Sequence, residues 1–255
     1  MTSRALLTVL LAVTAFSATS SAAELQPRTI AAFDRYARLT EARIDGPGPF
    51  ILGTLPRSEL LIERMVTRDA GREIDVPGGL IHHWMGTAFV PGATVDQALA
   101  LLQDYNSHAQ VYRPIVARSR LLGREGDTFR FHLRFLTKKV ITVVVNTDHE
   151  ARFTRPSADR ASARVHSTRI AEVEDPGTPQ ERELPVGNDG GYLWRLNTYW
   201  RLLEQDGGTY IQCESISLTR GIPTGFGWLI GPFVTSVPRE TLMFTLETTR
   251  TRLAG

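Results

Sequence analysis

The chain has 255 residues, of which 42% are apolar and 22% are charged. This composition is typical of a globular protein and excludes a disordered, collagen-like or coiled-coil chain. The 29 basic and 27 acidic residues leave a net charge of +2, and no run of Lys or Arg marks a basic patch. The charge pattern therefore argues against a nucleic-acid partner.

Residues 1–23 differ in pattern from the rest of the chain. Arg4 precedes an apolar run over residues 5–16, and small residues lead up to Ala23. This order is typical of a secretory signal peptide that is cleaved after Ala23, and the run is shorter than the ~20 apolar residues that span a membrane. We therefore expect a periplasmic or secreted protein whose mature chain has no transmembrane segment.

Residues 24–79 are predicted to form an N-terminal helical extension. Apolar residues at helical spacing, among them Ile30 and Phe33, predict a first helix that ends at the Gly-Pro-Gly-Pro sequence of residues 46–49. Residues 58–67 predict a second, short helix with an apolar face. Glycines and a proline then separate the extension from the larger body of the chain.

Residues 80–255 are predicted to form one α+β domain. A strand over residues 80–90 precedes a helix that begins at Thr94, where Thr94 and Gln97 form a capping box. Short connections between the strands that follow predict an antiparallel sheet, with the helices segregated from it. The later strands are predicted at 128–135, 140–145, 163–173, 192–203 and 209–218, and a long last helix at 237–253.

Three stretches of this body are similar to parts of known proteins. They are Gly-Leu-Ile-His-His-Trp-Met-Gly (79–86), Val-Asp-Gln-Ala-Leu-Ala-Leu-Leu-Gln-Asp-Tyr (95–105) and Gly-Trp-Leu-Ile-Gly-Pro-Phe (227–233), which precedes the last helix. With the order of the elements, they resemble the START-like (SRPBCC) superfamily of lipid-transfer proteins, polyketide cyclases and aromatases. The resemblance implies a helix-grip fold, in which a curved antiparallel sheet wraps around the C-terminal helix. It also implies a cavity between them for a lipid or an aromatic molecule.

Side chains on the strands and on the last helix are the candidates for contact with such a ligand. Aromatic residues alternate along the predicted strands, and apolar groups line most small-molecule pockets, although the same residues equally fill a solid core. The predicted ligand-binding residues are His83, Trp84, Phe131, Arg169, Trp194, Arg195, Glu214, Phe226, Trp228 and Leu246.

Three of these candidates are charged residues in the middle of otherwise apolar strands, namely Arg169, Arg195 and Glu214. A buried ion is costly unless it is paired, so an inward-pointing side chain would pair or would anchor a polar group of the ligand. Strand alternation equally allows all three to face solvent. His83 presents a similar choice, because His82 and His83 project from opposite faces of one strand.

Phe226 and Trp228 lie among the glycines and prolines of residues 221–233. Aromatic side chains on such a loop would gate the cavity or touch a membrane surface, or they would fold down as a plug against the last helix. Both interpretations stay open on the sequence.

No sequence signature of catalysis, metal binding or cofactor binding stands out. The chain has no nucleophile elbow, no His-Glu-x-x-His and no phosphate-binding loop, and the lone Cys213 lies in a strand pattern typical of a buried thiol. No cofactor is therefore expected. The first hypothesis is an exported binding protein for a hydrophobic small molecule or lipid. The alternatives are a cyclase or aromatase that uses Glu214 with a cavity His or Arg for proton transfer, and a solid-cored interaction domain.

Overall fold

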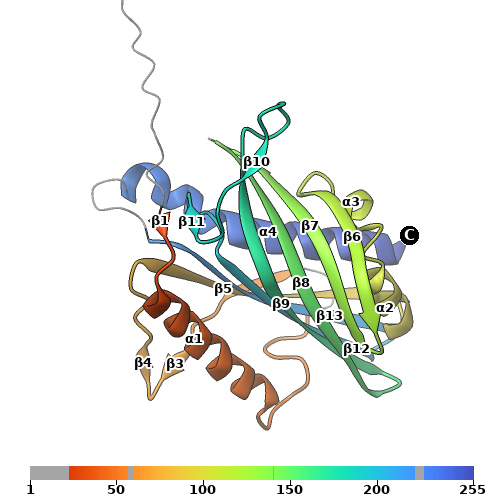
Figure 1. The fold of residues 1–255 in the computed structure, drawn as a ribbon. Coiled ribbons are helices and arrows are strands. Elements are labelled where there is room, and N and C mark those ends of the chain that lie inside the picture. Colours follow the sequence, from red (N-terminus) through yellow and green to blue (C-terminus); the bar gives the residue numbers. More distant parts are fainter. Residues whose placement is uncertain (1–22, 57–59, 140, 222–226) are drawn as a thin grey trace, which may run out of the picture.

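A large antiparallel sheet forms the centre of the protein, with a helix against each of its faces (Figure 1). The computed structural model describes residues 23–56, 60–139, 141–221 and 227–255, with the backbone alone for residue 23 and for 227–235. All but the last residue of the predicted signal peptide lies outside these ranges. Helix α4 (Gly227–Ala254) packs on one face of the sheet, and helix α1 (Pro27–Asp45) packs on the other.

The long strands lie side by side in one sheet. In that order its strands are β2 (Leu61–Arg64), β5 (Gly79–Pro91), β13 (Gly208–Arg220), β12 (Arg195–Gln205), β9 (Arg160–Glu174), β8 (Thr142–Ser157), β7 (Thr128–Lys138) and β6 (Val116–Glu125). Short two-residue strands add three pairings: β10 (Arg182–Glu183) with β9, β1 (Ala23–Glu24) with β11 (Asn188–Asp189), and β3 (Arg68–Asp69) with β4 (Arg72–Glu73).

Helices α2 (Val95–Gln103) and α3 (His108–Val111) carry the chain from β5 to β6 at the far edge of the sheet. The predicted capping box begins α2: the Gln97 backbone N–H donates to Thr94 Oγ1 at 3.2 Å, and the Thr94 N–H donates to Gln97 Oε1 at 2.9 Å. This topology, closed by α4, is the helix-grip arrangement, so the predicted α+β class and fold are confirmed. Within the described ranges, no helix is long and apolar enough to cross a membrane.

The second predicted helix of the N-terminal extension, over residues 58–67, is wrong. Its central part forms β2, which pairs antiparallel with β5 from Leu61 opposite Thr87 onward. Without β2, that side of β5 would be a sheet edge with unpaired backbone groups, and β2 supplies their hydrogen bonds. Ile62 of β2 also packs against the main apolar core, so a tertiary pairing overrides the local helical pattern.

Strand β13 is buried on both faces. Its odd-numbered residues, such as Cys213 and Ser215, face α4, whereas even-numbered residues, such as Glu214 and Ile216, face α1. Buried clusters therefore lie on both sides of the sheet. The larger cluster lies between the sheet and α4, and a smaller one, which includes Phe33 of α1, lies between the sheet and α1.

Gly86 in β5 allows α4 to approach the sheet closely. A Cβ atom at this position would lie 2.3 Å from Leu246 Cδ1 and 2.6 Å from Ile62 Cδ1, well inside van der Waals contact. Leu246 has no exposed surface, so its side chain has no free space into which it can move. The absence of a side chain at Gly86 therefore sets the distance between α4 and β5.

We expect Gly86→Ala to lower the free energy of unfolding by about 1–3 kcal/mol, as overpacking of a core does. Gly123 in β6 is the matched control, because a Cβ there would lie 3.6 Å from its nearest neighbour, Arg130 Nη2. Chemical denaturation of both variants measures the difference. Equal stability of the two variants would contradict the close helix–sheet contact.

Candidate functional site

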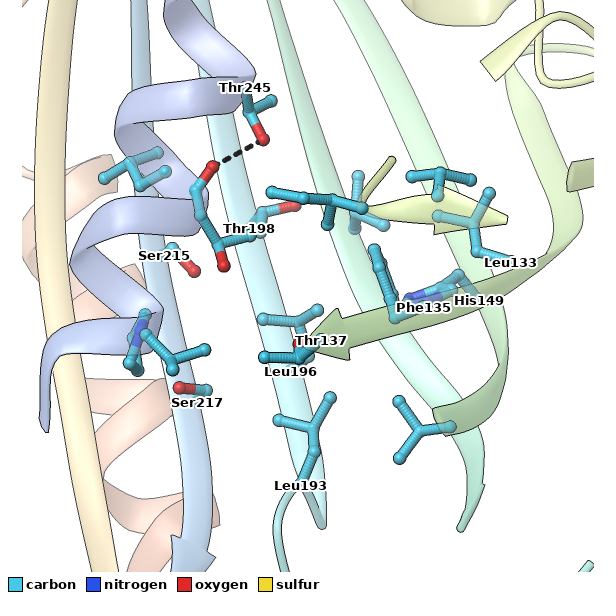
Figure 2. A pocket seen from close by; sticks show the side chains of 18 of the residues that line it. Leu133, Phe135, Thr137, His149, Leu193, Leu196, Thr198, Ser215, Ser217 and Thr245 are labelled. Atoms are coloured by element: carbon cyan, nitrogen blue, oxygen red, sulfur yellow. Dashed lines mark hydrogen bonds between the residues drawn. The ribbon is translucent and has the colours of Figure 1, made fainter. Parts of the chain in front are cut away.

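A cavity of about 760 Å³ lies between the sheet and α4 (Figure 2). Most of its lining is apolar and comes from β7, β8, β12, β13, α4 and the segment around α2 and α3. One end is lined by Ile141, Tyr192 and Pro238. Ile141 is 40% exposed, so the cavity reaches the surface at this end.

The wall formed by β7, β8 and the α2–α3 segment is aromatic. Tyr105 stacks on Phe131 with ring centroids 3.8 Å apart, and Phe131 also stacks on His149 at 5.0 Å. The Tyr112 hydroxyl shares a 3.0 Å hydrogen bond with Thr249 Oγ1 of α4. Burial raises the pKa of Tyr105 and raises the pKa of Tyr112 to about 12, so both phenols stay neutral near pH 7.

The opposite wall carries hydroxyl groups. Thr198 of β12 and Ser215 and Ser217 of β13 line the cavity on the side of α4 (Figure 2). Thr245 of α4 lies near them, but its hydroxyl already donates to the Thr241 carbonyl oxygen at 2.8 Å. Within the described ranges, the hydroxyls of Thr198, Ser215 and Ser217 make no hydrogen bond, so they are available to a ligand or to water.

His149 of β8 lies in the aromatic wall and is 3% exposed. Its Nε2 atom lies 2.8 Å from Thr147 Oγ1, and Thr147 Oγ1 donates to the Leu133 carbonyl oxygen at 3.0 Å. Because the Thr147 hydroxyl gives its single proton to Leu133, it accepts the proton of Nε2. His149 Nδ1 therefore carries no proton, and among the described residues it has no hydrogen-bond partner.

Burial lowers the pKa of His149 to about 3, against a smaller opposing effect of Asp148. In the unfolded chain the pKa of a histidine is ~6.5, so between these two values the unfolded state binds a proton that folded His149 does not. The free energy of unfolding therefore falls as the pH falls through this window, by up to ~1.4 kcal/mol per pH unit from this group.

We expect His149→Phe to flatten the pH dependence of stability between pH 6.5 and pH 4 relative to the unmodified protein, as urea denaturation measures it. His82, whose pKa burial lowers to about 4, contributes to both proteins and cancels in the comparison. An identical slope in the two proteins would contradict a buried, neutral His149.

Phe131, Trp84 and Leu246 are the predicted ligand-binding residues that lie on the α4 side of the sheet. Phe131 lines the cavity. Trp84 and Leu246 belong to the same apolar core but lie outside the lining. Phe226 lies outside the described residues, and for Trp228 the backbone of α4 alone is described.

Arg169, Trp194 and Arg195 do not line the cavity, which corrects their expected placement. Arg169 pairs with Glu183 on the exposed outer face of the sheet. Trp194 is buried in the cluster under α1, where its Nε1 donates to Asp189 Oδ1 at 2.9 Å. Arg195 donates to the Trp194 carbonyl oxygen at 2.9 Å. Strand alternation directs Arg169 and Arg195 away from the cavity, whereas Trp194 precedes β12 and packs in the cluster under α1.

His83 and Glu214 lie together, but on the α1 side of the sheet. The Tyr36 hydroxyl of α1 lies 2.9 Å from His83 Nδ1, and His83 Nε2 lies 2.7 Å from Oε1 of the fully buried Glu214. Arg43 of α1 also pairs with Glu214, and Arg201 Nη2 lies 3.7 Å from its Oε2. The expected placement of both residues in the cavity is thus corrected: they hold α1 against the sheet.

Burial raises the pKa of Glu214, but the hydrogen bond from His83 and the charges of Arg43 and Arg201 outweigh this effect, so its pKa is lowered. A lowered pKa means that the ionised carboxylate stabilises the folded state above the unfolded pKa of ~4.3. This contribution is lost as the pH falls through the lower pKa of the folded protein.

We expect Glu214→Gln to lower the free energy of unfolding at pH 7 by about 3–5 kcal/mol, because it leaves the buried Arg201 without a counter-charge. Glu183→Gln is the control, because the Glu183 side chain is 36% exposed and an exposed pair contributes about 1 kcal/mol or less. Equal stability of the two variants in urea would show that Glu214 does not hold a buried charge pair.

Sequence reasoning missed His149 of β8, which lines the cavity, and Thr147, which is hydrogen-bonded to its ring. They lie in the run Asn-Thr-Asp-His-Glu of residues 146–150, whose polarity is typical of an exposed strand. The signal that identifies them is alternation, because Val143 and Val145 precede them on the same face of the strand. Ser215 and Ser217 were missed because the selection on β13 was made by charge, which identified only the neighbouring Glu214.

No family model matches the sequence, and no curated protein matches it. A STAR-related lipid transfer protein from Xanthomonas axonopodis is 19% identical, with 71% of this chain and 96% of that chain covered and a TM-score of 0.49. The human StarD13 lipid transfer and protein localization domain is 7% identical, with 90% and 98% covered and a TM-score of 0.47. The Zhui aromatase/cyclase from Streptomyces is 10% identical, with 68% and 94% covered and a TM-score of 0.46. These similarities concern the fold alone, and the observation that bears on function is the cavity of this chain.

Proposed function

We propose that this chain is an exported protein that binds a hydrophobic small molecule or lipid between the sheet and α4. The observation that carries the proposal is the cavity of about 760 Å³ with its largely apolar lining. Protein interiors are close-packed, with few voids larger than a water molecule, and pockets of roughly 300–1,000 Å³ are typical of small-molecule sites. A space of this size therefore supports a ligand-binding function.

Binding in this cavity needs no covalent chemistry. Burial of apolar ligand surface contributes ~25 cal/mol per Å², and aromatic side chains such as Phe131 provide flat contact surfaces. The hydroxyls of Thr198, Ser215 and Ser217 face the cavity without partners among the described residues, so they can orient a polar group of the ligand. The expected ligand is therefore mainly apolar with few polar groups.

Export is supported by the pattern of residues 1–23, and the proposal places the protein in the periplasm or outside the cell. A mainly apolar molecule dissolves poorly in water, so its passage between membranes requires a carrier that shields it. Transient contact with a membrane surface, where the ligand is taken up or released, belongs to this proposal.

The cyclase or aromatase alternative has less support from the geometry. Glu214, the carboxylate that the sequence suggests for proton transfer, contacts α1 and lies on the other side of the sheet. Among the cavity histidines, burial lowers the pKa of His149 to about 3 and also lowers the pKa of His108, so neither is tuned for proton transfer near pH 7. The cavity volume in turn argues against a solid-cored interaction domain.

We expect Ser215→Phe to weaken the binding of the hydrophobic probe N-phenyl-1-naphthylamine at least about tenfold, because the ring occupies ligand space in the cavity. Thr142→Phe is the matched control, since Thr142 is an exposed hydroxyl residue on strand β8. Fluorescence titration of the delipidated proteins measures both affinities. Equal binding by the two variants would show that the probe binds elsewhere.

Native mass spectrometry of the mature protein, purified from its own cell envelope and then extracted with solvent, tests the function directly. A hydrophobic molecule at near-stoichiometric occupancy is the expected result, and its mass gives the ligand class. A protein that carries no ligand and takes up no hydrophobic probe would contradict the proposed function.

A further inference from the structure

We infer that the cavity selects apolar ligands with a neutral hydrogen-bond donor, such as an alcohol, and that His149 Nδ1 is the atom that accepts the donor's proton. The inference rests on the proposed ligand-binding function and specifies the head group of the ligand. Carboxylates and ethers, which have no proton to donate near pH 7, are then disfavoured at this position.

The proton of His149 is held on Nε2 by two consecutive hydrogen bonds. Leu133 and Thr147 lie opposite each other in the β7–β8 pairing, and the Thr147 hydroxyl donates across it to the Leu133 carbonyl oxygen at 3.0 Å. The hydroxyl oxygen is then an acceptor for Nε2, at 2.8 Å. A proton on Nδ1 would instead place two lone pairs against each other at this distance, or would force Thr147 to release Leu133.

The other ring nitrogen, Nδ1, is an acceptor without a partner. His149 is 3% exposed, and Nδ1 makes no hydrogen bond to any described residue. Buried polar atoms in proteins almost always have a partner, so an unpaired acceptor in the wall of a ligand cavity indicates that the ligand supplies the donor. The apolar surroundings of the cavity strengthen a hydrogen bond from the ligand to Nδ1, because water does not compete for it.

The backbone pairing beside His149 is irregular. The pairing of β8 with β9 contains a β-bulge beside His149, in which β9 carries one extra residue, Thr168, between the partners of Asp148 and His149. Bulges redirect side chains and are frequent beside binding sites.

Phe135 lies beside the His149 ring in the cavity wall. Its ring meets the His149 ring edge to face, with centroids 6.5 Å apart, and it lines the cavity beside His149 (Figure 2). Nδ1 itself has less than 1 Å² of exposed surface. Binding of a ligand hydroxyl to Nδ1 therefore requires a neighbouring ring, Phe131 or Phe135, to turn aside.

The discrimination follows from the hydrogen-bonding capacity of each head group. An alcohol donates its proton to Nδ1, whereas an ionised carboxylate and an ether present only lone pairs to it. The carboxylate would also lose its hydration in an apolar wall, which is costly without a counter-charge. Arg220 lines the cavity at the end that reaches the surface, where its Nη1 donates to the Gly190 carbonyl oxygen at 3.4 Å. A preference for carboxylates would therefore indicate a head group at that end.

The test is a competition experiment in which N-phenyl-1-naphthylamine is displaced by three ligands. They are dodecan-1-ol, its isomer 1-methoxyundecane, which has no O–H group, and dodecanoate. The measured quantity is the ratio of the alcohol and ether affinities, compared between protein variants, so that differences in the transfer of the two ligands from water cancel. We expect this ratio to be about 3–10 times larger in the unmodified protein than in His149→Phe.

Thr147→Val separates recognition from a merely structural role of His149. This variant keeps the histidine and the shape of the wall, but it removes the group that holds the proton on Nε2. We expect the alcohol-to-ether ratio to fall toward that of His149→Phe, and thermal melts confirm that each variant is folded. A long-range proton–nitrogen NMR spectrum of the unmodified protein is expected to show Nδ1 of His149 without a proton.

The outcomes separate the selection of the head group from the binding of an apolar ligand. Equal ratios in the unmodified protein and in His149→Phe, a proton on Nδ1, or tighter binding of dodecanoate than of dodecan-1-ol would each overturn the head-group inference. Displacement of the probe by the ligands in those cases still leaves the binding function standing. If the unmodified protein binds neither the probe nor any of the three ligands, the proposed function fails, and the inference fails with it.

Discussion

The burial of strand β13 on both faces is the constraint that organises this protein. Antiparallel sheets commonly leave one face to solvent, but here α4 covers one face of β13 and α1 covers the other. Alternation along the strand then assigns Ser215 and Ser217 to the cavity and Glu214 and Ile216 to α1. A shift of one residue would exchange these sets, placing a carboxylate in the cavity and hydroxyls under α1.

The contacts under α1 show why the N-terminal extension belongs to the fold. The Thr67 backbone N–H donates to the Tyr36 hydroxyl at 2.8 Å, and Tyr36 in turn contacts His83, which contacts Glu214. In this series each group donates one proton to the next, from Thr67 through Tyr36 and His83 to Glu214. One arrangement of donors and acceptors therefore satisfies the whole network. Buried charge pairs contribute little net stability, but removal of one member is costly, so the network favours one docking position of α1, with Arg201 completing it.

The elements that sequence reasoning predicted correctly are those fixed by local signals. The capping box at Thr94 begins α2, and strict alternation places Phe131 of β7 in the cavity wall. Strand β2 was missed because its partner, β5, is distant in the sequence, and backbone pairing outweighs a weak helical pattern. The charged candidates failed for a different reason: charge shows that a residue is unusual in a strand, but not which of two covered faces it joins. That choice depends on α1, whose position no local pattern near Glu214 specifies.

The cavity exists because α4 contacts the sheet closely along only part of its length, and because small residues face the remaining space. At Leu246 the helix lies against Gly86 with no room for a methyl group, and beyond it Thr249 is fully buried and hydrogen-bonded to Tyr112. Toward its other end, Thr241 and Thr245 line open space. The facing strand residues there are also small, namely Thr198, Ser215 and Ser217. A solid core would need large apolar side chains at these positions, because close packing is what stabilises an interior. Small hydroxyl residues leave the volume unfilled and at the same time supply polar groups, so one choice of residue type provides both the space for an apolar ligand and the means to orient it.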